Sequence, residues 1–334
     1  MTVPSIPATW SSLTWQQLCR VWTAKVCYGG NPDAARCAAL LSLCGLAVKC
    51  GAGTDAATGE DVYILRGTDR RLCTVTPRQL AYLARTALPW FDYPYGDPGI
   101  REEKDETGRV VREGREGVRG LVNPDTGNWH DAMELTEETV CVGGHTFALP
   151  QVALNNLTWH QYRALQAIAP QLFAEGVTGD VAIGLQAQFL AYCLVAEQPE
   201  KEKPDDAFHP SHVFRYQAER AEASVPFWKK QISASLEDGI VLFHVCFQVY
   251  QTAMQNYYPA VYPLLFDAGG KSESLHTALS GEVGTINAIM KYAGYSDQQQ
   301  VYDTNLPIVF DILNAMTKEA KQVEEMNRKI RTRK

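Results

Sequence analysis

The sequence predicts a mainly α fold, in which two related helical modules, each with a small β-hairpin, are joined to a C-terminal helical unit. The stretch Leu157-Thr158-Trp159-His160-Gln161 is nearly a copy of Leu13-Thr14-Trp15-Gln16-Gln17. Apolar residues recur at helical spacing after both copies. Hydrophobic residues make up 46% of the 334 residues and charged residues 21%, which is enough apolar material for a sizeable core.

Both copies have the chemistry of a helix start. Thr14 and Thr158 are placed to cap a helix, and Gln17 and Gln161 follow three residues later, where the side chain of a capping box reaches back. Each cap is preceded by Leu, and each Gln is followed by an apolar residue, so a hydrophobic staple is also possible. Two helix starts with the same chemistry indicate a duplicated module.

The first module is expected to occupy residues 1–91. Gly29-Gly30-Asn31-Pro32 ends the first helix and begins the second, with the asparagine as cap and the proline in the first turn. The second helix is predicted from Asp33 to about Cys50, where Gly51 ends it. Two β-prone runs and a further helix start complete the module: Val62–Leu65, Leu72–Val75 and Thr76.

The composition changes between residues 92 and 135. Tyr93–Gly99 is rich in Pro and Gly and cannot continue a helix, and Arg101–Arg119 contains twelve charged residues in nineteen. A segment of this composition cannot bury enough apolar area to order itself. We therefore predict an exposed, mobile insertion between the two modules.

The second module is expected over residues 136–200. Gly143-Gly144 lies between two short β-prone runs in Val140–Phe147, which is the pattern of a tight hairpin. The helix that starts at Thr158 should be kinked or shortened by Pro170. Val181–Ala196 then repeats the second helix of the first module.

The C-terminal unit is expected over residues 201–334. Its main element is predicted to be one long helix over Phe227–Asn256, which ends at Tyr257-Tyr258-Pro259. Other parts of the protein must cover the apolar half of this helix. Loop-like sequence follows over Asp267–Gly281. The remaining elements are a short helix, its terminator, a short capped turn and a last helix: Thr285–Ala293, Gly294, Ser296–Gln299, and Leu306 to about Ile330.

Charge, hydropathy and cysteine spacing limit the kinds of partner and the cellular compartment that fit this chain. The formal charge of −7 argues against a nucleic-acid-binding body, since phosphate contacts need clustered Lys and Arg. The start of the chain lacks the features of a secretory signal, and every apolar run is too short to span a bilayer. The nine cysteines form no CxxC pair, and their odd number disfavours a complete disulfide set. We expect reduced core thiols in a cytoplasmic protein, with no membrane partner.

Motifs that resemble catalytic or metal sites are incomplete. Gly269-Gly270-Lys271-Ser272 resembles the end of a phosphate-binding loop, but Leu265 stands where the first glycine is required, so a surface loop is expected. His209 and His212 lack further ligands at supporting spacing. His145 and His244 are interpreted as structural residues. The sequence therefore predicts no catalytic residue, no cofactor and no metal, and a protein that is not an enzyme.

The last helix offers the candidate partner-binding residues. Its basic tail fits an acidic partner surface or nucleic acid, although positive charge there also complements the helix dipole. The predicted contact combines apolar and basic residues, namely Leu306, Val309, Phe310, Leu313, Arg328, Lys329 and Arg331.

Two stretches carry a resemblance to a known group of proteins. Asn287–Ser296, followed by the helix from Leu306, resembles tail assembly chaperones and related proteins from tail-gene clusters of bacteriophages and prophages. Val142–Pro150, leading into Leu157–Tyr162, is similar to proteins of Bacteroidetes phages and prophages. The resemblance implies a non-enzymatic tail assembly or scaffold factor that binds other phage-like structural proteins, such as a tape-measure or tail-tube protein.

Two other functional classes stay open at this point. One is an enzyme of unknown reaction whose site is assembled from scattered loops, which requires a polar pocket with perturbed titratable groups. The other is a nucleic-acid-binding accessory protein that uses the basic C-terminal tail, although nucleic acid is not the expected partner of this acidic chain.

Overall fold

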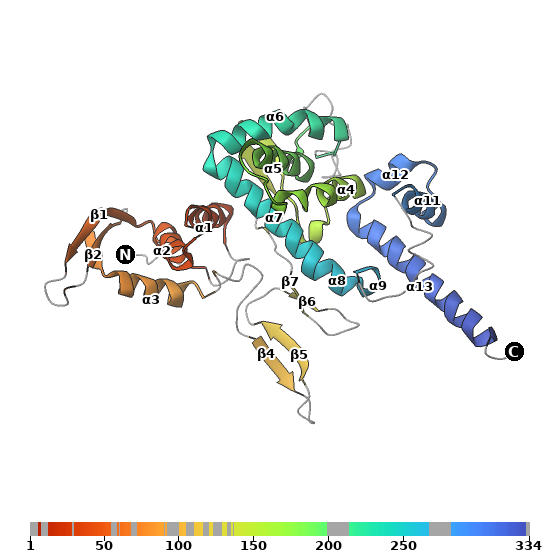
Figure 1. The fold of residues 1–334 in the computed structure, drawn as a ribbon, viewed down its shortest axis with the longest axis horizontal. Coiled ribbons are helices and arrows are strands. Elements are labelled where there is room, and N and C mark those ends of the chain that lie inside the picture. The colour runs from red at the N-terminus through yellow and green to blue at the C-terminus, as the bar shows by residue number, and fades with distance from the viewer. Residues whose placement is uncertain are drawn as a thin grey trace. The chain divides into compact units, whose positions relative to one another are not determined.

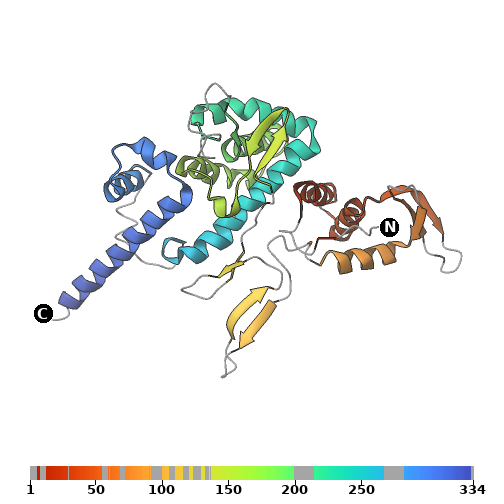
Figure 2. The same ribbon diagram turned by 180° about the vertical axis from the view of Figure 1, so that it is seen from behind.

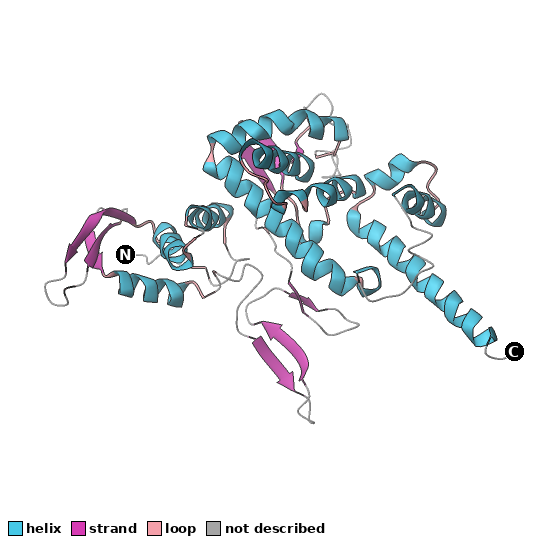
Figure 3. Cartoon of the chain, viewed as in Figure 1, coloured by secondary structure: helices cyan, strands magenta, loops and turns pink. Residues whose placement is uncertain are grey.

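The computed structural model describes residues 6–7, 13–28, 30–54, 59, 61–67, 72–89, 91, 100–104, 110–115, 120–122, 129–131, 135, 137–198, 214–266 and 282–331. The fold is mainly α, as predicted, with small antiparallel sheets (Figure 3). Contacts divide the chain into two compact units. Unit 1 comprises Met1–Glu137 and Ser235–Val245, and unit 2 comprises Glu138–Ala234 and Cys246–Lys334.

The helices of unit 1 begin at the predicted caps (Figure 1). They are α1 (Trp15–Cys27), α2 (Pro32–Leu43) and α3 (Pro77–Ala87). The side chains of Thr14 and Thr76 complete capping boxes with the glutamines three residues on. Each box satisfies two backbone N–H groups that the helix itself leaves without partners, which fixes where the helix begins.

The second helix is shorter than predicted, and a three-stranded sheet follows it. This helix ends at Leu43 and not near Cys50, because Gly45 adopts a left-handed backbone with φ of 64°. The chain then forms β1 (Ala47–Thr54), which pairs with β2 (Asp61–Arg66). The predicted hairpin is present as β2 and β3 (Leu72–Val75), and the strand order is β1-β2-β3.

The charged segment contains regular backbone pairing that the sequence did not predict. β4 (Ile100–Lys104) pairs with β5 (Val110–Arg115), and β6 (Gly120–Val122) pairs with β7 (Trp129–Asp131). Backbone hydrogen bonds of a hairpin do not require an apolar core, and β-branched residues such as the two valines of β5 favour extended backbone. The segment was expected not to order itself, whereas these four strands have regular backbone pairing, and its exposed and mobile character stays a prediction.

Unit 2 starts with the predicted hairpin and helix pair. β8 (Thr139–Val142) and β9 (His145–Ala148) are joined by Gly143 and Gly144, both with positive φ, as a two-residue hairpin turn requires. A short third strand, β10 (Val195–Ala196), pairs with β9 where continued helix was predicted. The helices are α4 (Trp159–Ile168), which ends just before Pro170 as predicted, and α5 (Gly179–Cys193).

The long helix predicted over Phe227–Asn256 is broken. α6 (Ala218–Ala234) ends where Ser235 turns to extended backbone, with φ of −134° and ψ of 126°, and the serine side chain accepts a hydrogen bond from Asp238 N. Helix resumes with a wide turn over Leu236–Val241 and with α7 (Leu242–Thr252). The break is a new helix start with its own cap, so the prediction of one continuous helix is wrong.

The helical path also continues past the predicted stop at Pro259. A second wide turn over Ala253–Tyr257 leads into α8 (Tyr258–Val261), which the proline starts and does not end, since its fixed φ suits a first turn. α9 (Pro263–Phe266) follows. The predicted loop Asp267–Gly281 lies outside the described residues.

The last elements lie near their predicted positions, but the cap of the short turn predicted over Ser296–Gln299 is Asp297 and not Ser296, since the Asp297 side chain accepts a hydrogen bond from Gln300 N at 2.9 Å. α11 (Glu282–Ala293) ends at Gly294, whose φ is 73°. α12 (Gln298–Asp303) is capped by Asp297, and α13 (Leu306–Arg331) runs for 26 residues. The core of unit 2 lies where α4 to α8 and the first half of α13 bury large side chains, among them Phe189, Leu165, Trp228 and Tyr258.

Candidate functional site

The four apolar residues predicted to bind a partner lie in the core of unit 2. Leu306, Val309, Phe310 and Leu313 have exposed fractions of 0%, 0%, 4% and 7%. The Phe310 ring is surrounded by aromatic rings of other elements, with the Tyr258 ring centroid 4.5 Å away. The prediction that these four face a partner is corrected, because the chain itself covers them.

The start of α4 holds the start of α13 in place. Trp159 N donates to the carbonyl oxygen of Thr304 at 2.9 Å, and Leu306 N donates to that of Leu157 at 2.8 Å. Thr158 and Asn305 form a single antiparallel bridge between these two bonds. The capping stretch that begins α4 therefore also fixes where α13 begins, and so which half of α13 is buried.

The second half of α13 has the opposite environment. Every residue from Gln322 to Ile330 is exposed. Figures 1 and 2 show this half running beyond α9, α11 and α12 to the C-terminus. Three large apolar side chains, Val323, Met326 and Ile330, are exposed there by 56%, 61% and 54%. At spacings of three and four residues they share one side of the helix, and we call them the open stripe.

Two members of the open stripe, Val323 and Ile330, continue the pattern of the buried half. Apolar positions step alternately by three and four residues along the whole helix, which is a heptad repeat with one polar member, Asn327. The first positions of this seam are buried within unit 2, and the last ones are exposed. The seam consists of Leu306, Val309, Leu313, Met316, Ala320, Val323, Asn327 and Ile330.

The exposed half of α13 carries charged residues of both signs. Seven Lys or Arg and three Glu lie between Lys318 and Lys334, a balance of +4 in a chain whose formal charge is −7. Arg328 and Lys329 are exposed, and their contact with a partner stays a prediction. The side chain of Arg331 lies outside the described residues. The structure thus places Arg328 and Lys329 in the same exposed half of α13 as three apolar side chains that the sequence did not single out.

A groove between α4, α5 and α6 is a second candidate. It has a volume of about 460 Å³ and is open to solvent. The Tyr192 hydroxyl donates to a Glu222 carboxylate oxygen at 3.4 Å, and burial followed by this carboxylate raises the pKa of Tyr192. The phenol therefore stays protonated at neutral pH. The groove is lined by Ala164, Ala167, Ile168, Gln188, Tyr192, Glu222 and Val225.

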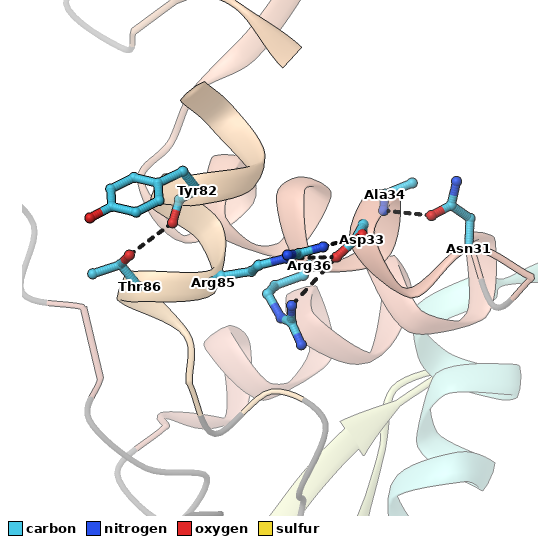
Figure 4. Close-up of polar contacts among 7 residues, drawn as sticks. All are labelled: Asn31, Asp33, Ala34, Arg36, Tyr82, Arg85 and Thr86. Carbon is cyan, nitrogen blue, oxygen red and sulfur yellow. Dashed lines mark hydrogen bonds and ion pairs between the residues drawn. The ribbon is translucent and has the colours of Figure 1, made fainter. Parts of the chain in front are cut away.

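The charged cluster in Figure 4 ties α2 to α3. Arg85 donates two hydrogen bonds to the Asp33 carboxylate, at 2.7 Å and 3.2 Å, and Arg36 lies 3.5 Å from the same carboxylate. The bonds from Arg85 lower the pKa of Asp33. Since Asp33 and Arg85 are largely exposed, the ion pair is screened by solvent, and it positions the two helices more than it stabilises them.

The histidines that are described pack against aromatic rings. His244 stacks on Trp22, with ring centroids 5.9 Å apart, and burial lowers the pKa of His244. His145 meets Phe227 edge to face. His209, His212 and the Gly269–Ser272 motif lie outside the described residues. In the described part of the chain, no three His, Cys, Asp or Glu residues gather as a metal site would require.

Comparisons with protein-family models, with curated proteins and with solved structures give no match to this chain. The candidate site therefore rests on the geometry of the chain itself. As to membranes, no helix among the described residues is both long enough and apolar enough to cross a bilayer.

The cysteines are distributed differently from the prediction. The eight described thiols are free, but Cys27, Cys73 and Cys141 are exposed and not in the core. Cys27 is the last residue of α1, and Cys73 and Cys141 lie in β3 and β8. The remaining described thiols are buried or half-buried, as expected: Cys19, Cys37, Cys44, Cys193 and Cys246.

Proposed function

We propose that this protein is a non-enzymatic assembly or scaffold factor that binds other proteins through the exposed end of α13. The observation that carries the proposal is the open stripe. Val323, Met326 and Ile330 are each more than half exposed, whereas the first three seam positions of the same helix, Leu306, Val309 and Leu313, are buried. Apolar side chains aligned on one helix face are how helices dock onto partner helices and grooves.

The resemblance to tail-cluster proteins of phages and prophages gives this proposal a biological setting. In that setting the partners are other structural proteins of a phage-like particle, and a tape-measure protein with long helices is the partner that best suits a heptad seam. The mainly α fold is compatible with such a role.

The test is co-purification from cells that carry the native gene neighbourhood. The variant Val323→Ser/Met326→Ser/Ile330→Ser removes the open stripe, and Ile308→Ser, which changes a 49% exposed residue near the other end of α13, is the matched control. We expect the wild type and the control to retain the same tail-cluster protein and the triple variant to lose it. Circular dichroism checks that helix content is unchanged in both variants.

Recovery of the same proteins with the triple variant would contradict the proposal, because binding would then not use the open stripe. Recovery of the wild type alone, as a stable monomer, would contradict any assembly role and would direct attention to the groove beside Tyr192 and Glu222.

A further inference from the structure

The groove between α4, α5 and α6 combines apolar walls with a single carboxylate at one end. We propose that it is a docking site for an arginine side chain of a partner protein. The guanidinium of this arginine would meet the Glu222 carboxylate and the Tyr192 ring, and its aliphatic stem would lie along the apolar walls. The inference concerns a different surface from the open stripe and goes beyond the proposed function.

Three helices of unit 2 form the groove (Figure 1), and α5 contacts both α4 and α6. Two of the residues that α4 contributes, Ala164 and Ala167, have small side chains, which leaves a space of about 460 Å³. Binding pockets typically measure about 300–1,000 Å³. Because this space is open to solvent, a free small molecule would stay partly uncovered in it. A side chain of a protein that docks over the opening would be covered.

Glu222 is the only charged residue among the described residues that line the groove. The Tyr192 hydroxyl lies 3.4 Å from its carboxylate, whereas a typical O–H···O bond measures about 2.7–2.8 Å. In the described part of the chain, no basic side chain forms an ion pair with this carboxylate. A carboxylate has about four lone-pair sites, so most of the acceptor capacity of Glu222 stays available to a ligand.

The backbone of Glu222 adds a second acceptor. Pro226 lies inside α6, and proline has no N–H to donate to the carbonyl four residues earlier, which is that of Glu222. Helix carbonyls point toward the helix C-terminus, here toward Val225 and Pro226, and Val225 lines the groove. The α6 wall therefore presents a carbonyl without its usual helical donor in addition to the carboxylate.

A second carboxylate and two phenols make the same end acidic and aromatic. Glu219 lies one turn before Glu222 on α6 and is exposed. Burial, followed by Tyr192 and the carboxylates of Glu222 and Glu219, raises the pKa of Tyr216. The Tyr216 hydroxyl is buried and has no hydrogen-bond partner among the described residues. Negative charge beside aromatic rings is the environment that a guanidinium prefers.

Basic residues of the neighbouring elements do not line the groove. Arg163 of α4 donates to a glutamine one turn further along that helix. Arg215 and Arg220 line a different and smaller cavity beside β10. Lys229 lies seven residues beyond Glu222, which is about 10 Å along α6, so salt of about 0.1 M largely screens its charge at Glu222.

Arginine matches these groups better than lysine does. Its planar guanidinium has five N–H donors, pairs with a carboxylate through two parallel bonds and stacks on aromatic rings. Its methylene stem can lie on Ala164, Ile168 and Val225 while the charged end reaches Glu222. The ammonium of lysine is more strongly hydrated and makes no such planar contact.

The experiment titrates the full chain with the end-blocked tripeptides Leu-Arg-Leu, Leu-Lys-Leu and Leu-Gln-Leu, and with agmatine, a small free guanidinium compound. NMR spectra of isotope-labelled Ala and Ile methyl groups report on the groove through Ala164, Ala167 and Ile168. We expect saturable shifts of these signals with Leu-Arg-Leu. Its affinity should be at least about threefold higher than that of Leu-Lys-Leu or agmatine, and Leu-Gln-Leu should bind more weakly still.

Four variants assign the binding to the groove. Glu222→Gln should weaken binding of Leu-Arg-Leu about tenfold, because the guanidinium loses its charged acceptor, whereas Glu175→Gln, which removes an exposed carboxylate outside the groove, should leave it unchanged. Ala167→Trp, at an exposed position, should fill the groove and abolish binding of every probe. Met326→Ser, in the open stripe, should have no effect. Circular dichroism checks that each variant keeps its helix content.

Several outcomes would overturn the inference. Absence of saturable shifts with Leu-Arg-Leu, or binding that Glu222→Gln leaves unchanged, overturns the site. Equal affinity for Leu-Lys-Leu or Leu-Gln-Leu overturns the choice of arginine. Agmatine that binds as tightly as Leu-Arg-Leu overturns a protein partner, since the occupant is then a small guanidinium compound. Each of these results leaves the open stripe untouched, because co-purification tests that surface separately.

Discussion

The Tyr258 hydroxyl donates a hydrogen bond of 2.5 Å to the carbonyl oxygen of Ala153, and both residues are buried in unit 2. Ala153 and Leu154 have left-handed backbones, each with φ of 56°. That conformation costs a residue with a side chain about 1–2 kcal/mol. The hydrogen bond from Tyr258 satisfies a carbonyl of this strained turn and connects it to the helices that surround Phe310.

Replacing Tyr258 by Phe should therefore destabilise unit 2. The variant leaves the buried Ala153 carbonyl without its donor, which costs about 1–3 kcal/mol of unfolding free energy. Urea unfolding measures the change, and Tyr82→Phe, at a residue that is 70% exposed, is the control and should have no effect. Equal unfolding midpoints for the two variants would show that the bond does not support the turn.

The two copies of the capping motif should differ in how much they stabilise their helices. Gln161 is fully buried, and its side chain accepts from Thr158 N at 3.0 Å and donates to the Tyr192 carbonyl at 2.9 Å. Gln17 makes the equivalent bond to Thr14 N at 2.9 Å, but in an exposed position. Gln161→Met removes both of these hydrogen bonds, whereas Gln17→Met removes only the solvent-exposed bond to Thr14 N.

We expect Gln161→Met to cost about 1–3 kcal/mol more than Gln17→Met, since it removes bonds of a fully buried side chain and leaves the part-buried Tyr192 carbonyl without this donor. Amide hydrogen exchange, read separately in α1 and α4, measures each helix in its own unit. Faster exchange in α4 of Gln161→Met than in α1 of Gln17→Met is the expected result, and the reverse order would contradict it.

Local chemistry explains which parts of the fold the sequence predicted. The caps Thr14, Thr76 and Thr158 act on backbone groups within three residues, and Gly143-Gly144 sets its own turn, so each was predictable from a short stretch. The break at Ser235 was missed although its cap is also local. Apolar residues continue at helical spacing on both sides of Ser235, and this periodicity concealed the new start.

Distant contacts explain what the sequence did not predict. β1 continues the apolar run of α2, and only its pairing with β2 makes it a strand. Likewise, Phe310 and Val323 both follow the apolar pattern of α13. Phe310 is covered because Trp159 and Tyr162 of α4 and Tyr258 of α8 pack their rings on it, and no periodicity within α13 encodes these contacts, whereas Val323 is exposed.

The stability of unit 1 should decrease in mild acid because of His244. Burial lowers the pKa of His244 in the folded chain, whereas the unfolded chain has the ordinary value of about 6.5. Below about pH 6.5 the unfolded state therefore binds more protons, so stability is complete above this pH and decreases as the pH falls. Trp22 and Phe243 face the imidazole, and Lys25 lies near the Trp22 ring.

Urea unfolding followed by hydrogen exchange in α1, at pH 7.5 and 5.5, measures this effect. The wild type should lose stability between the two values, and His244→Phe, which keeps an aromatic ring against Trp22, should lose less. An equal loss in the wild type and the variant would assign the acid sensitivity to other groups.

Alkylation should modify exposed cysteines faster than buried ones. Burial, together with the charges of Glu237, Asp238 and Glu137, raises the pKa of Cys19 to about 12, so its thiolate is scarce at pH 8. Iodoacetamide should modify the exposed Cys27 in the native protein and leave Cys19 unmodified until the chain is unfolded. Mass spectrometry of digested samples checks this, and rapid labelling of Cys19 in the native state would contradict its buried position.

The most direct measurement of the central claim is photo-crosslinking in cells that carry the native gene neighbourhood. A benzophenone amino acid is placed at position 326 in the open stripe or, as a control, at position 308 on the same helix. The account predicts a crosslink to one other protein from position 326 that position 308 does not give. No crosslink from position 326, or the same products from both positions, would contradict a docking surface at the end of α13.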